Sequence, residues 1–68
     1  MNNIKKARLN KGYTQTELAE KLGISTVSIW MWETGKRFPR MTRLKQIADI
    51  LGTEPYKLLP DFNGKEVG

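Results

Sequence analysis

The stretch that decides the fold runs from Gln15 to Trp32 and reads QTELAEKLGISTVSIWMW. Within it, Ala19 and Gly23 stand four residues apart, and apolar residues recur around them at the spacing of two short helices that cross at a tight turn. Ala19 is expected where the helices approach most closely, because a larger side chain would push them apart. Gly23 is expected to end the first helix, since glycine adopts the left-handed conformation without steric cost. The pattern predicts that the second helix lies on the outside of the molecule.

Start and stop signals predict three helices in the first half of the chain. The first begins near residue 2 or 3. Thr14, followed three residues later by Glu17, forms a capping box that opens the second helix. Ser25 is expected to cap the third. Glycines are expected to end all three helices, and they are Gly12, Gly23 and Gly35.

The second half of the chain predicts two more helices and no strand. A helix is expected from Met41 to Leu51, because apolar residues follow the i, i+3, i+4, i+7 spacing at Leu44, Ile47, Ala48 and Leu51. Thr53 is expected to cap a short fifth helix with Pro55 in its first turn. Three residues of this last helix are expected to close the core: Tyr56, Leu58 and Leu59. The predicted fold is therefore all-α, a compact domain of five helices.

Length and composition bound the function. The chain has 68 residues, enough for one domain that buries about 60% of its unfolded surface. We expect this domain over residues 1–59 and a flexible tail over residues 60–68. The sequence has no cysteine and no histidine, which removes zinc ligand sets, thiol nucleophiles and imidazole bases. We expect no catalytic residues, no metal, no cofactor and no small-molecule substrate, so the chain is not predicted to be an enzyme.

The sequence predicts no membrane association. No apolar run approaches the length of about 20 residues that spans a bilayer. The N-terminal residues MNNIKKARLN are basic but lack the apolar segment of a signal peptide. We therefore expect a cytoplasmic protein.

Positive charge is concentrated in one segment of the chain. The formal net charge is +5, from 12 basic and 7 acidic residues. Between Thr34 and Ala48 there is no acidic residue, and the basic residues there are Lys36, Arg37, Arg40, Arg43 and Lys45. This distribution predicts a local positive patch suited to a polyanionic partner such as double-stranded DNA.

Two motifs carry a resemblance to a known family. The chain reads T-Q-x-E-L-A-x-x-L-G-I-S from Thr14 to Ser25 and W-E-x-G-K-R-x-P from Trp32 to Pro39. With these motifs, residues 4 to 59 resemble the Cro and lambda-repressor family of helix-turn-helix proteins. The resemblance implies a five-helix domain whose third helix reads the DNA major groove as part of a homodimer on a pseudo-palindromic operator. Small members of the family include phage lysis-lysogeny regulators.

The resemblance also implies roles for individual residues. Gln15 corresponds to a residue that binds a DNA phosphate, and a helix N-terminus favours an anion there. Arg8 and Glu33 correspond to a partly buried ion pair that joins the first helix to the end of the third and serves a structural role. The residues expected along the DNA backbone, with Arg43 added from the basic segment, are Gln15, Thr34, Lys36, Arg37, Arg40 and Arg43.

The positions that should face DNA bases are short of hydrogen-bonding side chains and leave two interpretations open. These positions are Ser25, Thr26, Val27, Trp30 and Met31. In the first interpretation, the chain is a Cro-like DNA-binding regulator with modest sequence choice. In the second, the apolar stripe of Val27, Trp30 and Met31 binds a partner repressor, as in an antirepressor that modulates another protein's DNA binding. Trp30 folding over its neighbours would be a simpler explanation of its exposure. Phe38 is expected either at a dimer contact or in the core.

Overall fold

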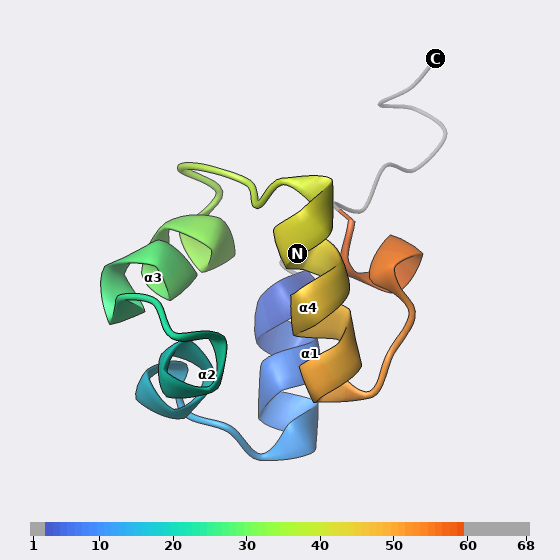
Figure 1. The fold of residues 1–68 in the computed structure, drawn as a ribbon, viewed down its shortest axis with the longest axis horizontal. Coiled ribbons are helices and arrows are strands. Elements are labelled where there is room, and N and C mark those ends of the chain that lie inside the picture. The colour runs from blue at the N-terminus through green and yellow to red at the C-terminus, as the bar shows by residue number, and fades with distance from the viewer. Residues whose placement is uncertain (1–2, 60–68) are drawn as a thin grey trace.

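The computed structural model describes residues 3–59 of the chain. This part forms α1 (Asn3–Lys11), α2 (Gln15–Leu22), α3 (Thr26–Thr34), α4 (Met41–Leu51) and the 3-10 helix η1 (Pro55–Leu58), with no strand among these residues. In Figure 1, α1 and α4 lie side by side at the centre, α2 and α3 lie together on one side, and η1 lies on the other. The predicted tail, residues 60–68, lies outside the described residues.

The predicted caps of α2 and α3 are confirmed. The Thr14 hydroxyl accepts a hydrogen bond from the Glu17 N–H at 3.0 Å, and the Glu17 carboxylate accepts one from the Thr14 N–H at 2.8 Å. The Ser25 hydroxyl accepts one from the Val27 N–H at 3.0 Å. Gly23 ends α2 with φ at 71°, the left-handed conformation that reverses the chain toward α3. Local sequence therefore fixes both ends of the turn between α2 and α3.

The core lies where the four α-helices and η1 meet. Ala19 is 2% exposed, in agreement with its predicted place in the interior, and Leu18 beside it is fully buried. The α4 face predicted from spacing is also buried. The buried apolar residues of the described chain are Ile4, Leu18, Ala19, Ile29, Leu44, Ile47, Ala48, Leu51 and Leu58. Every element contributes at least one of them, so the position of α3 depends on the whole domain.

The prediction of five helices is wrong, because residues 3–59 contain four α-helices followed by a single 3-10 turn. The last element is four residues long, and its Lys57 N–H donates to the Glu54 carbonyl at 3.0 Å, an i to i−3 bond. Leu59 is extended, as expected for a residue that precedes proline. The turn therefore stops before an α-helix can form.

Two predicted details of this last element are also wrong. Glu54, without a side-chain capping bond, takes the N-cap position predicted for Thr53. Tyr56 is 65% exposed and does not close the core. Leu58 and Leu59 meet the core instead, the first fully and the second partly buried.

Candidate nucleic-acid interface

The helix α3 has one buried and one exposed face. Ile29 is fully buried and Glu33 is 8% exposed, whereas Val27 is 59% and Trp30 is 44% exposed. Thr26 and Met31 are partly exposed, and the N-cap Ser25 is exposed. We call the set Ser25, Thr26, Val27, Trp30 and Met31 the outer face of α3. The geometry thus brings these predicted residues together on the surface of one helix.

Exposed basic residues follow the C-terminal end of α3. Lys36, Arg37 and Arg40 are all exposed in the segment that leads from α3 to α4. The backbone N–H groups of Lys36 and Arg37 both donate to the Met31 carbonyl, at 2.9 and 3.3 Å, so this segment folds back onto the end of the helix. The Lys36 ammonium lies 5.9 Å from the centre of the Trp30 ring. A cation at that distance is attracted by the ring.

Gln15 and Thr34 already make hydrogen bonds inside the protein. The Thr34 hydroxyl donates to the Trp30 carbonyl at 2.9 Å, which uses the single proton that a hydroxyl can donate. The Gln15 side-chain amide donates to Glu33 Oε1 at 3.0 Å. Because that amide nitrogen carries two hydrogens, one remains for an external acceptor.

Arg43, which was predicted to follow the DNA backbone, makes hydrogen bonds inside the protein. Its side chain is partly buried, and its Nη1 donates to the Leu22 carbonyl at 3.3 Å and to Gln46 Oε1 at 3.0 Å. The Leu22 carbonyl belongs to the last turn of α2, where helix carbonyls lack partners within the helix. Arg43 therefore ties α4 to the end of α2.

A buried ion pair fixes α3 against α1. Arg8 Nε donates to Glu33 Oε2 at 2.6 Å and Arg8 Nη2 to Glu33 Oε1 at 3.0 Å, with both side chains less than a tenth exposed. Arg8 Nη1 also donates to the Tyr13 carbonyl at 2.7 Å. Together with Gln15, the network joins α1, the turn before α2, the start of α2 and α3. It holds α3 against α1 and the start of α2.

Two contacts in this part of the structure could not be predicted from the residue types. The Tyr13 carbonyl is a backbone group, so no residue type marks it as a partner of Arg8. Lys36 follows Trp30 by six residues across the glycine that ends α3, and only the folded turn brings the two together. Both contacts became visible only in the folded structure.

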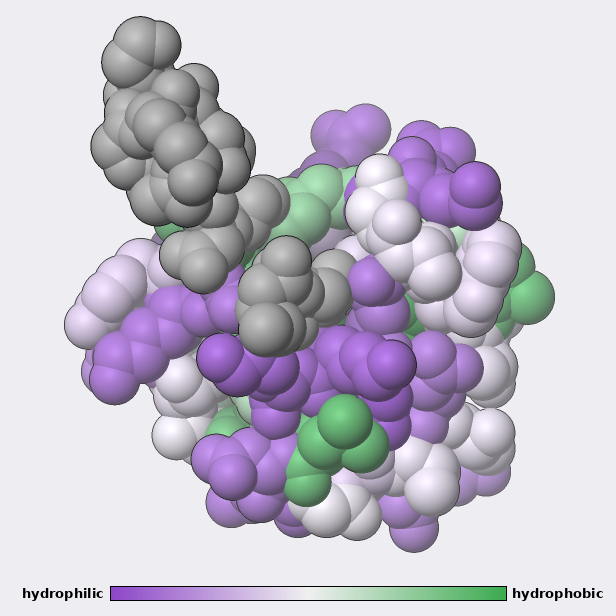
Figure 2. All heavy atoms as spheres, turned by 180° about the vertical axis from the view of Figure 1, so that it is seen from behind, coloured by the Kyte–Doolittle hydropathy of each residue, from purple (hydrophilic) through white to green (hydrophobic). Residues whose placement is uncertain are grey.

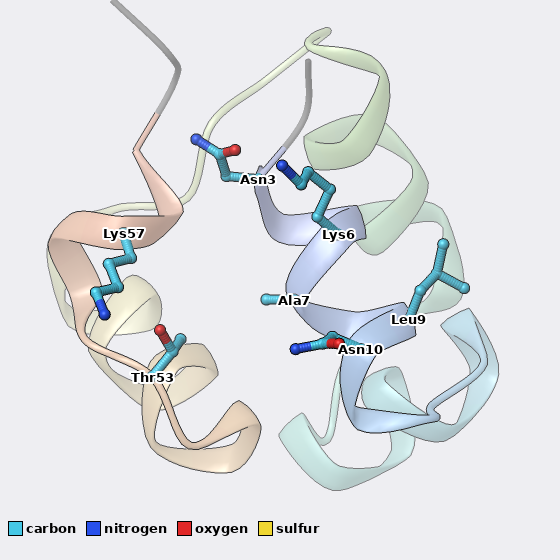
Figure 3. Close-up of a pocket in the computed structure, with 7 residues that line it drawn as sticks. All are labelled: Asn3, Lys6, Ala7, Leu9, Asn10, Thr53 and Lys57. Carbon is cyan, nitrogen blue, oxygen red and sulfur yellow. The ribbon is translucent and has the colours of Figure 1, made fainter.

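Outside α3, the domain carries an open hollow. Seen from behind Figure 1, the surface is mostly hydrophilic, with hydrophobic atoms in separate spots (Figure 2). A hollow of about 670 Å³ lies between α1 and the segment around η1, with Ala7 and Asn10 pointing across it toward Thr53 and Lys57 (Figure 3). Within residues 3–59 there is no group of three acidic side chains close enough to hold a metal ion. No helix of this part is long and apolar enough to cross a membrane.

The chain matches the helix-turn-helix family over residues 4–58. It belongs to this family. The expected resemblance to the Cro and lambda-repressor type is thereby confirmed.

Three curated relatives share between a third and two fifths of their aligned residues with it. The HTH-type transcriptional activator BcrR of Enterococcus faecalis is 38% identical over 82% of this chain and 28% of its own length. The SPbeta prophage-derived uncharacterized HTH-type transcriptional regulator YonR of Bacillus subtilis is 38% identical over 82% of this chain and 52% of its own. The uncharacterized HTH-type transcriptional regulator YqaE of the same species is 35% identical over 96% and 56%. The chain therefore covers between 28% and 56% of the length of these relatives. No solved structure matches it significantly.

Proposed function

We propose that this chain is a DNA-binding transcriptional regulator that places α3 in the major groove. The observation that carries the proposal is the outer face of α3, which reaches the surface and is followed along the chain by three exposed cations, while the opposite face of the helix is buried. A helix displayed in this way fits the width of the groove. The names of the three relatives, all HTH-type transcriptional regulators or activators, support the same activity.

In this proposal, the cations supply affinity and the outer face supplies sequence choice. Lys36, Arg37 and Arg40 contact phosphates, and the free amide hydrogen of Gln15 donates to another phosphate at the start of α2. The bond from Gln15 to Glu33 holds that amide in place before DNA arrives. Thr34 and Arg43 contribute less, because each would first have to give up a bond within the protein.

Salt dependence of binding tests the proposal. Binding of the chain to a mixed-sequence duplex, measured by fluorescence anisotropy, should weaken as salt rises, and Arg37→Ala or Arg40→Ala should each lower the slope of log K against log salt by about 0.9. Lys57→Ala is the matched control, since Lys57 is an exposed cation in η1, on the far side of the domain from α3 (Figure 1). An equal loss of slope for Lys57→Ala would contradict the assigned surface.

A second function, an antirepressor of a phage lysis-lysogeny switch, is favoured by the apolar character of the outer face. Val27 and Trp30 are 59% and 44% exposed, and aromatic side chains of this kind dominate many protein interfaces. The prophage origin in the name of YonR supports a phage setting. A gel-shift titration of operator DNA, with and without a repressor encoded together with this chain, separates the two functions. Loss of the repressor's own shift, restored by Trp30→Ala, favours the antirepressor, whereas a saturable shift by this chain alone favours the DNA-binding regulator.

A further inference from the structure

The outer face of α3 carries no side chain of the types that make paired hydrogen bonds to a base. The Ser25 hydroxyl accepts a hydrogen bond from the Val27 N–H, and the hydroxyls of Ser25 and Thr26 each offer only single hydrogen bonds to a partner. Between residues 25 and 34 there is no Arg, Lys, Asn or Gln, the residue types that make paired hydrogen bonds to guanine or adenine. Recognition by such paired hydrogen bonds is therefore closed to this helix.

What α3 presents instead is apolar surface at the positions that reach bases. Val27 is the second residue of the helix, and the N-terminal part of a recognition helix is the part that contacts base edges. Trp30 follows one turn later on the same side. The only apolar group that unmodified base pairs expose in the major groove is the C5-methyl of thymine. The exposed side chains and this methyl group are all apolar, so contact between them removes apolar surface from water.

The charge around the face favours DNA over a protein as the occupant. The Lys36 ammonium lies over the Trp30 ring itself, and Arg37 and Arg40 are exposed in the same segment after α3. No acidic residue occurs between Thr34 and Ala48 to offset these charges. A duplex that binds through its phosphates is thus brought against the same apolar side chains.

We propose that Val27 and Trp30 select DNA by contact with C5-methyl groups in the major groove, so that the preferred half-site is rich in thymine. The proposal rests on the proposed function, because it requires α3 to enter the groove. It assigns sequence choice to pyrimidine methyl groups, and therefore 5-methylcytosine should substitute for thymine.

Two pairs of synthetic duplexes test the proposal by changing the methyl group alone. The first pair is alternating dA-dT and the same duplex with deoxyuridine for thymidine. The second is alternating dG-dC and the same duplex with 5-methylcytidine for cytidine. Measured by anisotropy at one salt concentration, the methylated member of each pair should bind about 4-fold more tightly for every methyl buried, since burying one such group stabilises by about 0.8 kcal/mol.

Substitution on α3 shows whether Val27 is responsible. Val27→Ser should reduce the affinity ratio within both pairs toward one, with salt dependence unchanged. Tyr56→Ser is the matched control, because Tyr56 is 65% exposed against 59% for Val27 and lies in η1, away from α3. Circular dichroism checks that both variants keep their helices.

The other outcomes separate this proposal from the proposed function. Equal, salt-dependent binding to all four duplexes would overturn methyl selection and leave DNA binding standing. Equal binding together with a Val27→Ser change in oligomeric state, seen by sedimentation, would assign the face to a protein contact instead. Failure to bind any of the duplexes at low salt would remove the proposed function, and methyl selection with it.

Discussion

Glu33 accepts hydrogen bonds from the side chains of two residues that belong to different helices, Arg8 of α1 and Gln15 of α2. The side chains of Arg8 and Glu33 are 7% and 2% exposed, so removing one of them leaves the charge of the other buried. An intact buried pair adds little net stability, but a single stranded charge is costly. The pair thus acts as a geometric constraint on α3.

Glu33→Ala should destabilise the domain by about 3 kcal/mol, because it leaves the buried Arg8 guanidinium without a counter-charge. That is a large part of the roughly 3–10 kcal/mol expected for a domain of this size. Urea unfolding followed by circular dichroism measures the change. Gln15→Ala should cost only about 1 kcal/mol, since it removes one hydrogen bond to the same carboxylate. An unchanged unfolding curve for Glu33→Ala would contradict the structural role.

Single residues were predictable where a short motif fixes their environment. Helix caps join residues only two to four positions apart, so their roles followed from the sequence alone. The residues concerned are Thr14, Glu17, Gly23 and Ser25. The bonds of Gln15 to Glu33 and of Arg43 to Leu22 span 18 and 21 residues. Contacts of that range depend on how the helices pack, which local pattern does not contain.

At the scale of secondary-structure elements, the turn between α2 and α3 is fixed by caps on both sides. Gly23 sits at φ 71°, and no atom within 4 Å would meet an added Cβ, so the requirement for glycine there comes from the backbone conformation alone. The boundaries of α4 were also predicted correctly, because its four buried residues follow a clear helical period. The last element was not, since a four-residue segment before Pro60 is too short to show a period.

Thr14→Ala should lower the free energy of unfolding by about 1 kcal/mol through loss of the α2 cap. Thr16→Ala is the matched control, because Thr16 is an exposed threonine in the first turn of the same helix. It should leave stability unchanged or slightly higher, since alanine is the better helix former. Thermal melts of both variants make the comparison. Equal effects would mean that the capping box does not stabilise α2.

At the scale of the whole molecule, we propose that two copies bind one operator. Phe38 is 42% and Met41 is 55% exposed where the segment after α3 enters α4, which places Phe38 outside the core and leaves the dimer contact as its proposed role. If α3 of each copy occupies a major groove on one face of the duplex, the half-sites lie one helical turn apart, about 34 Å.

Inserting half a helical turn between selected half-sites should abolish joint binding, because it moves the second groove to the other face of the duplex. Inserting a full turn leaves the faces aligned and serves as the control. Stoichiometry by sedimentation on each duplex gives the readout, with two copies expected on the selected site. One copy per duplex at every spacing would show that the chain acts as a monomer.

The central claim, that the outer face of α3 is the surface that meets DNA, is tested most directly by nuclear magnetic resonance. The full chain would be titrated with the tightest duplex recovered from a random-sequence pool. We predict the largest shifts at the Trp30 indole N–H and at the amides of residues 25–31, 36–38 and 40, with the amides of η1 unchanged. Large shifts around Lys6 and Lys57 at the hollow of Figure 3, with α3 unmoved, would contradict it.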